Sequence, residues 1–269
     1  MTATPSPPPP GSDRASVSVV IPVKDDAQHL RRCLRALALQ TETPDEIVVV
    51  DNGSRDDSAA VARAAGARVV VCTEPGIPAA AAAGYDSAAG DVILRLDADC
   101  VPGATWVADL RDAFEERPHV DVLTGGARFI DGPRMLRRPL AAVYLGCYAM
   151  FGVLALGHLP LFGSNLAFRR SAWRDVSRRV HRRDPDLHDD FDLAFHLGER
   201  HVIRRAARAP MGISMRPFAE PRSFALRITR GFRTVTAHWP FDLPPTRLVR
   251  RWLRRARARI GDCRTGGTA

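Results

Sequence analysis

Residues 90–99 read GDVILRLDAD, and the interpretation of the whole chain starts from them. An aliphatic run ends in two carboxylates, Asp97 and Asp99, which are separated by one small residue. Within a strand, this spacing would point both side chains to the same face. Two hard oxygen ligands suit a divalent cation that keeps several waters and binds phosphate oxygens. An isolated Asp-x-Asp is more often a solvated turn, so the neighbouring segments decide its meaning.

Strand-like and helix-like segments alternate around this stretch. β-branched runs bounded by turn signals predict strands, and apolar residues at helical spacing predict helices. This alternation indicates βαβ units and a mainly parallel α/β sheet flanked by helices. Strands are predicted at 17–22, 46–51, 68–72 and 91–97, with short ones at 120–124 and 127–130, and helices at 26–40, 56–65, 76–89 and 103–117.

Open parallel sheets bind ligands beyond the carboxyl ends of their strands. Pro22, Asp51 and the Asp97–Asp99 pair all fall at such ends. The sequence therefore predicts that these separate loops form one acidic site.

Composition limits the classes of protein without choosing a function. The chain has 269 residues, of which 45% are hydrophobic and 26% charged, as expected for a globular protein with a real core. The net charge is +9 and Lys24 is the only lysine, so the excess is nearly all arginine. Such a balance suits phosphates, nucleic acid or an anionic membrane surface. The five cysteines include no CxxC pair, so we expect thiols in a reducing compartment and no zinc site.

Three regions are expected along the chain. Residues 1–14 are Pro-rich, lack the pattern of a signal peptide and predict a disordered tail. Residues 15–220 would form the main domain, with one half at 15–125 and the other at 126–220. Residues 221–269 would be a basic, helical C-terminal extension.

Two apolar segments raise the question of a membrane. Residues 139–168 contain no Asp, Glu, Lys or Arg and are long enough to span a bilayer. A span would separate Asp99 from the acidic cluster near Asp190, so we favour a buried or interfacial segment at 139–163. Leu248–Ile260 carries an apolar stripe flanked by arginines. It is either a helix on an anionic surface or one packed on the domain with a solvated basic face.

Taken together, these pieces resemble the family 2 glycosyltransferases, which are inverting enzymes with the GT-A fold. The similarity covers residues 16 to about 205. Each motif is weak alone, but their common order is specific. The matching segments are VVIPVKDD (19–26), VVVDNGSRDDS (48–58), GIP through Gly84 followed by Gly90-Asp91, LDAD (96–99), GSN (163–165) with FRR (168–170), and HDDFDL (188–193).

The resemblance implies a role for each matching position. The cofactor would be Mg²⁺ or Mn²⁺, and Asp190 would be the general base. Asp97 and Asp99 would hold the ribose, the diphosphate and the metal. The nucleotide sugar would be contacted by Pro22, Asp26, Asp51 and Asp97, and the acceptor side would be formed by Gly163, Ser164, Asn165 and Asp189.

Two positions depart from the family pattern. Ala81-Ala82 stands where an arginine followed by asparagine is common, so a phosphate-side cation is missing. Another basic residue could substitute. His196 stands where an arginine is common after the Asp-Leu pair.

The expected function is sugar transfer from a nucleotide-sugar donor to an acceptor hydroxyl by metal-assisted single displacement. A lipid-linked or glycan acceptor of the cell envelope is expected, as is an anionic membrane surface, whereas nucleic acid is not. The expected location is cytoplasmic, as a peripheral protein on the inner face of the plasma membrane. Two alternatives stay open, namely a non-catalytic GT-A-like binding protein and a nucleotidyltransferase.

Overall fold

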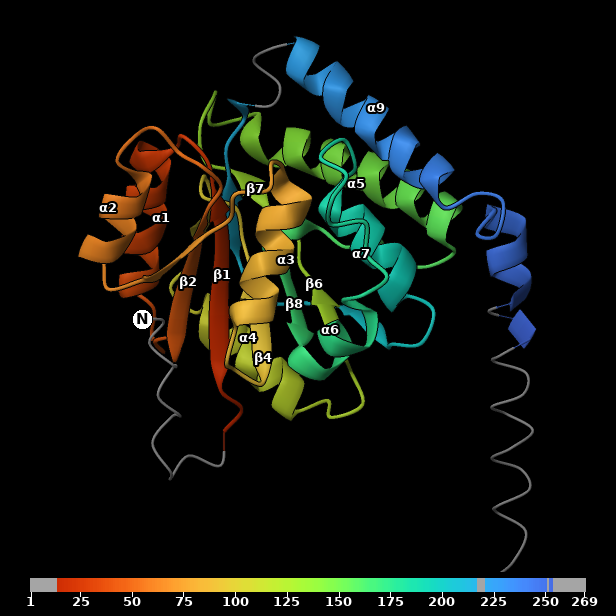
Figure 1. The fold of residues 1–269 in the computed structure, drawn as a ribbon, viewed down its shortest axis with the longest axis horizontal. Helices are drawn as coiled ribbons and strands as arrows, with labels where there is room; N and C mark the ends of the chain where they lie inside the picture. Colours follow the sequence, from red (N-terminus) through yellow and green to blue (C-terminus); the bar gives the residue numbers. More distant parts are fainter. Residues whose placement is uncertain (1–13, 217–220, 251, 254–269) are drawn as a thin grey trace, which may run out of the picture.

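The computed structural model contains a seven-stranded mixed sheet covered by helices, as Figure 1 shows. It describes residues 14–216, 221–250 and 252–253, so the predictions for residues 1–13 and 254–269 lie outside the described part. The large sheet has the strand order β3-β2-β1-β4-β8-β6-β9, and a small sheet has the order β5-β10-β7.

The strands are short, and most follow the predicted positions. They are β1 (Val17–Val23), β2 (Glu46–Asp51), β3 (Arg68–Val71), β4 (Val92–Arg95), β5 (Val101–Pro102), β6 (Val122–Thr124), β7 (Arg128–Phe129), β8 (Leu166–Arg169), β9 (Ile203–Arg205) and β10 (Met211–Ile213).

The helices separate these strands in the sequence. They are α1 (Ala27–Ala38), α2 (Ser58–Ala64), α3 (Ile77–Ser87), α4 (Trp106–Glu115), α5 (Arg137–Leu156), α6 (Arg170–Val176), α7 (Asp189–Leu197) and α9 (Pro221–Ala237), with a 3₁₀ turn at Gly163–Asn165.

The first four strands pair in parallel, as the alternating pattern predicts. The later strand β8 runs antiparallel to both β4 and β6, which makes the sheet mixed but mainly parallel. One expectation is corrected. β4 ends at Arg95, so Asp97 and Asp99 lie in a turn beyond the strand rather than on one strand face. The turn, and not the pleat, brings the two carboxylates together.

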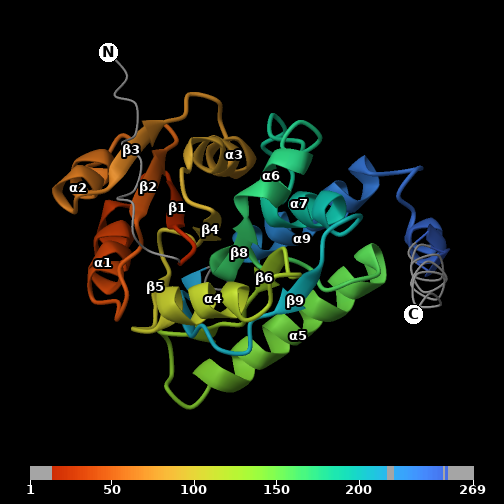
Figure 2. The same cartoon turned by 90° about the horizontal axis from the view of Figure 1, so that it is seen from below.

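Helices cover both faces of the sheet, as the view from below in Figure 2 shows. α1, α4 and α5 lie on one face, and α3, α6 and α7 lie on the other. Strand β1 is buried along its whole length. Its Val19 and Ile21 join the core beneath α1 and α4, whereas Val20 joins the core beneath α3. Burial on both faces explains why the parallel strands read as continuous aliphatic runs.

Helix α3 approaches the sheet closely at Gly84. A Cβ atom there would lie 2.4 Å from Val20 Cγ1 and 2.9 Å from Val50 Cγ2. We predict that Gly84→Ala lowers the free energy of unfolding by about 1–3 kcal/mol, because the added methyl group overpacks the helix–sheet contact. Urea unfolding followed by circular dichroism measures the change.

Gly146→Ala provides the matched control, since Gly146 lies inside α5 with nothing within 4 Å of its would-be Cβ. Alanine there should stabilise the protein by up to about 1 kcal/mol through helix propensity. Equal effects of the two substitutions would contradict the close packing of α3.

Candidate active site

A buried arginine, Arg95, lies at the centre of the acidic cluster. It is the last residue of β4, and its side chain is only 3% exposed. Its Nη2 atom lies 2.9 Å from Asp97 Oδ1 and 3.1 Å from Asp189 Oδ2. Burial by itself lowers the pKa of Arg95, but Asp189 and Asp97 outweigh it and raise the pKa well above the usual value. Arg95 thus joins the loop after β4 to the first turn of α7.

The 3₁₀ turn at Gly163–Asn165 holds Asp97 and one further carboxylate of the cluster, Asp190. The Gly163 amide donates to Asp190 Oδ2 at 2.9 Å, and the Ser164 hydroxyl donates to Asp97 Oδ2 at 2.6 Å. Gly163 is required because a Cβ there would lie 1.6 Å from Arg95 Nη1. The turn therefore fixes Asp97 and Asp190 at the same time.

Asn165 has a structural role in place of the acceptor contact expected from sequence. It is 1% exposed, and its amide nitrogen donates to the carbonyl oxygens of Gly126 and Ala209. Its carbonyl oxygen accepts a 2.9 Å hydrogen bond from Trp106 Nε1. The side chain has no free polar group for a ligand and instead ties the turn to α4 and to the loop before β10.

Asp189 and Asp190 are neighbours in sequence but differ in environment. Asp189 is paired with Arg95, and its pKa is raised to about 6, chiefly by burial. Asp190 has one oxygen bound by the Gly163 amide. Its other oxygen, Oδ1, is buried without a hydrogen-bond partner among the described residues, and His188 Nδ1 lies 3.8 Å away. Asp190 is thus the carboxylate with an oxygen left for a new partner.

A second arginine, Arg216, reaches the site from the segment after β10. Its Nη2 atom lies 2.7 Å from Asp26 Oδ2 and 3.1 Å from Asp99 Oδ2. Its side chain is 48% exposed, unlike that of Arg95. Burial raises the pKa of Asp99, as does the neighbouring Asp97, whereas Arg216 opposes the increase. Asp99 is therefore paired with an exposed arginine side chain that can move away from it.

The Asp97–Asp99 turn fits a hard divalent cation. Ligand atoms of Asp97, Asp99 and Cys100 lie within 4.8 Å of one another. Burial raises the pKa of the Cys100 thiol well above its usual value, so the sulfur stays protonated and is a poor ligand. The remaining donors are carboxylate oxygens, which suit Mg²⁺ or Mn²⁺.

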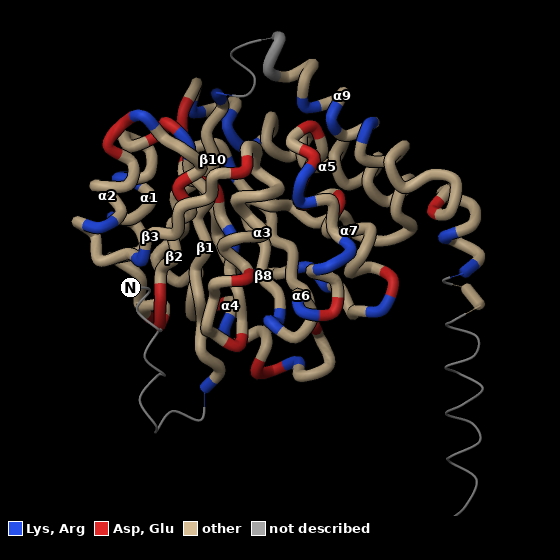
Figure 3. The backbone as a smooth tube through the Cα atoms, viewed as in Figure 1, with Lys and Arg blue, Asp and Glu red and all other residues tan. Residues whose placement is uncertain are grey.

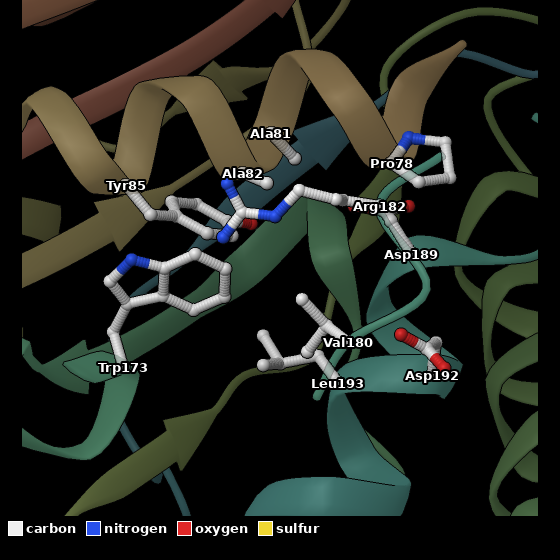
Figure 4. A pocket seen from close by; sticks show the side chains of 10 residues that line it. All are labelled: Pro78, Ala81, Ala82, Tyr85, Trp173, Val180, Arg182, Asp189, Asp192 and Leu193. Atoms are coloured by element: carbon white, nitrogen blue, oxygen red, sulfur yellow. The ribbon is translucent and has the colours of Figure 1, made fainter. Parts of the chain in front are cut away.

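The space beside Ala81 and Ala82 explains the missing arginine in part. Both alanines are buried and line a cavity of about 20 Å³, which is too small for a longer side chain. Figure 4 shows the side chain of Arg182 lying across this cavity beside the two alanines. Its Nη1 atom pairs with Asp86 at 2.6 Å and its guanidinium lies over Trp173. Arg182 therefore fills the space but is committed to other partners.

Two predicted residues make no side-chain hydrogen bond or ion pair with the Arg95 cluster in the described part of the chain, although Pro22 lies only two residues beyond Val20, which pairs with Arg95 of β4. Asp51 ends β2, which is separated from β4 by β1, and its Oδ1 accepts a hydrogen bond from the Ser54 amide. Pro22 lies within β1, opposite Val50 of β2. The structure thus brings together Asp97, Asp99, Asp189 and Asp190, with Asp26 joined to them through Arg216.

Sequence reasoning missed both arginines of the site. Arg95 did carry a signal, since a charge inside the apolar run VILRL needs a buried partner. Arg216 is more than 100 residues from either of its partners, Asp26 and Asp99, and only the fold brings them together.

The geometry agrees with the comparisons. A family model described as "Glycosyl transferase family 2" matches residues 18–177. Glycosyltransferase AglE of Haloferax volcanii is 33% identical over 99 residues, which cover 34% of this chain and 33% of that protein. An undecaprenyl-phosphate 4-deoxy-4-formamido-L-arabinose transferase of Pseudomonas fluorescens is 42% identical over 93 residues, or 31% and 27% of the two chains. The matches thus span about a third of these relatives.

Solved structures share the fold. Glucosyl-3-phosphoglycerate synthase from Mycobacterium tuberculosis, in complex with Mn²⁺, UDP and glucosyl-3-phosphoglycerate, superposes with a TM-score of 0.55 at 21% identity. The match covers 80% of this chain and 78% of that one. The predicted fold class, a GT-A-type α/β fold with a mainly parallel sheet, is confirmed.

Because Arg216 pairs with Asp99, it would compete with a cation for that carboxylate, which gives a testable prediction. Arg216→Met should tighten Mn²⁺ binding in the absence of nucleotide, because Asp99 loses its protein counter-ion. Asp99→Asn should weaken Mn²⁺ binding strongly, since one of two carboxylate ligands is lost. Electron paramagnetic resonance of free Mn²⁺ measures both affinities.

Arg174→Met is the matched control, because it removes the same charge from an exposed position on α6. If Arg216→Met and Arg174→Met changed Mn²⁺ affinity equally, the effect would be one of net charge, and the competition would be refuted.

Proposed function

The chain belongs to glycosyl transferase family 2, and on that premise we propose that it transfers a sugar from a nucleotide-sugar donor to an acceptor hydroxyl by a metal-assisted, inverting single displacement. The observation that carries this proposal is the free oxygen of Asp190. It is a buried carboxylate oxygen without a partner among the described residues, and it belongs to the same cluster as the Asp97–Asp99 pair. That cluster offers one base and one cation site, which a single displacement needs.

Asp97 and Asp99 would bind Mg²⁺ or Mn²⁺ together with the donor diphosphate. The cation would stabilise the charge that builds up on the diphosphate as the glycosidic bond breaks. A structural neighbour that carries Mn²⁺ and UDP-glucose supports this class of donor. Ser164 and Arg95 would keep Asp97 in place, since both contact its carboxylate.

Arg216 would take over the phosphate-side charge that Ala81 cannot supply. In the structure it neutralises Asp99 and Asp26. When a cation takes Asp99, the exposed guanidinium would be released next to the bound diphosphate, and arginine forks bind phosphate oxygens well.

Asp190 would accept the proton of the acceptor hydroxyl as the hydroxyl attacks the anomeric carbon. The Gly163 amide binds one oxygen of Asp190 and orients the other. One displacement inverts the anomeric centre and needs one base, in contrast to the paired carboxylates of glycoside hydrolysis.

The acceptor would be lipid-linked, and the protein would bind the cytoplasmic leaflet peripherally. α5 is the one helix in the described part of the chain that is long and apolar enough to cross a bilayer. Its flanking segments, however, share one site, because Arg95 before it pairs with Asp189 after it. A crossing helix would separate them, so an interfacial position fits better.

The surface beside α5 supports the same interpretation. Large apolar side chains of α5 and of the C-terminal part, which includes α9, are exposed. Helices α5 and α9 contact each other through Tyr144 and Arg227. In Figure 1 both helices lie at the end of the domain toward which β1 runs, and Figure 3 shows basic but no acidic bands along α9. The exposed side chains include Val143, Met150, Phe151, Leu154, Phe232, Trp239 and Phe241.

A nucleotide-sugar screen tests the proposal and its two alternatives. Release of nucleoside diphosphate that requires Mn²⁺ or Mg²⁺ is the expected result. Release of pyrophosphate would identify a nucleotidyltransferase, and donor binding without turnover on any acceptor would identify a binding protein. Full turnover in EDTA would refute the role of the metal.

Asp190→Asn should lower kcat by about 10²- to 10⁴-fold, the usual contribution of general-base catalysis. Donor binding should change little, because the amide retains the shape and the expected nucleotide contacts lie on other loops. Steady-state kinetics and calorimetric donor titration measure the two quantities. Turnover near that of the unsubstituted protein would show that the base is another residue, with Asp189 or Asp192 next to be examined.

Replacing Met150, Phe151 and Leu154 of α5 together by serine should reduce flotation with anionic liposomes, because these exposed side chains would enter the lipid interface. Flotation of the unsubstituted protein with anionic liposomes should decrease as salt is added, because salt screens the attraction between surface arginines and anionic lipids. Serine at Leu39 and Val71, two exposed apolar residues outside α5 and the C-terminal part, is the control. Unchanged flotation of the α5 variant would exclude α5 as the contact.

A further inference from the structure

A second cluster of metal-ligating side chains is built around α7 and includes Asp192, three residues beyond Arg95's partner Asp189. It contains Asp192 and His196 of α7, His181 from the loop before α7, and His238 just after α9. One ligand atom from each of the four residues lies within 4.8 Å of the others. The proposed transfer reaction, with Asp190 as its base, uses none of the four.

All three imidazoles face one oxygen of Asp192. Asp192 Oδ1 lies 2.7 Å from His181 Nδ1, 3.2 Å from His238 Nε2 and 3.6 Å from His196 Nε2. A tetrahedral site with metal–ligand bonds of 2.0–2.1 Å has ligand–ligand edges of about 3.3 Å. The three Asp192–histidine separations bracket that value, and the histidine nitrogens lie within 4.8 Å of one another, so modest side-chain movements would create the site.

Hydrogen bonds alone leave polar atoms of this cluster without partners. His238 Nδ1 lies 2.8 Å from the Thr234 carbonyl oxygen and therefore carries the hydrogen, which leaves Nε2 of a neutral ring as an acceptor facing a carboxylate. Asp192 Oδ2 is already bound by the His181 amide, so the three rings compete for the lone pairs of Oδ1. Nε2 of His196 and of His238 are both buried without a hydrogen-bond partner among the described residues.

The surroundings resemble those of a closed metal site. The hydrogen bond from His238 Nδ1 to the Thr234 carbonyl oxygen fixes the ring, as backbone carbonyls commonly do for histidines that bind a metal. Phe195 stacks on His238 with ring centroids 3.9 Å apart. His181 is exposed beside an open hollow, which gives an ion a path from solvent.

We propose that His181, Asp192, His196 and His238 bind one structural Zn²⁺ ion, separate from the Asp97–Asp99 site. Three imidazoles and one carboxylate form a complete tetrahedral set of ligands that suits Zn²⁺, whereas Mg²⁺ and Mn²⁺ favour the oxygen ligands of the other site. Since the ligands come from α7, the preceding loop and the end of α9, the ion joins the C-terminal helix to the helix that carries Asp190.

The sequence-based expectation of no zinc site rested on the absence of a CxxC pair. That argument tests only cysteine-rich sites. His181 and His238 are 57 positions apart by their numbering in the chain, and no local spacing reveals that they meet.

The test uses the full chain with Asp99→Asn, which removes the other cation site, after stripping with a chelator. Zn²⁺ titration should give one ion per chain, a melting temperature that rises with Zn²⁺ concentration, and tetrahedral visible absorption when Co²⁺ replaces Zn²⁺. Adding His238→Gln should weaken Zn²⁺ binding more than about 100-fold. Losing only a group that hydrogen-bonds to a ligand already lowers metal affinity about 10- to 100-fold, and this substitution removes a ligand itself. His119→Gln, an exposed histidine outside the cluster, should change nothing.

Equal Zn²⁺ affinities of the His238→Gln and His119→Gln proteins would overturn the proposal. If His238→Gln does not fold, the Co²⁺-loaded parent chain decides, because proton NMR should show hyperfine-shifted imidazole signals from three histidines. No such signals, or no Zn²⁺ bound by the stripped parent chain, would show that the four residues form a proton-linked ion cluster only.

Discussion

The pairing of the buried Arg95 guanidinium with Asp97 and Asp189 is the interaction on which the site depends. An arginine that is 3% exposed at the end of a central strand must be matched by charge, because a buried unpaired ion costs several kcal/mol. Its two partners come from segments that precede and follow the long helix α5. The same ion pair that stabilises the strand end therefore sets the distance between the Asp97–Asp99 turn and the helix of the proposed base.

Around this pair, each carboxylate of the cluster is held by at least one partner, but two of them are held differently from the rest. Ser164 and Arg95 bind the two oxygens of Asp97, and the Gly163 amide binds one oxygen of Asp190. The exceptions are informative. Asp190 keeps a free oxygen, and Asp99 is held by an exposed arginine that a cation can displace. The groups left available are those that a metal-assisted transfer would use, whereas the committed ones hold the geometry.

Helix α7 connects this chemistry to the C-terminal part of the chain. Its first turn carries three acids, of which Asp189 and Asp190 serve the Arg95 cluster and Asp192 faces the three histidines. The helix also receives α9, since the amide of His188 donates to the hydroxyl of Thr234. Because α9 and α5 expose apolar side chains at one end of the domain, contact with a lipid surface would act on the same helix that positions Asp190.

The sequence by itself determined the parallel strands β1 to β4 and the identity of the acids, but it gave no sign of β8 and β9. Short β-branched runs bounded by turn signals, such as that of β1, indicated strands buried on both faces, and the order of the family motifs located Asp97, Asp99 and Asp190. The tertiary structure decided which atoms remain free, that Asn165 is a structural residue, and that Arg216 and His238 reach the two clusters. The physical reason is the distance along the chain over which each kind of interaction acts. Hydrophobic periodicity and turn chemistry act over a few residues, whereas charge pairing and ligand geometry join groups that only the completed fold brings within about 3 Å.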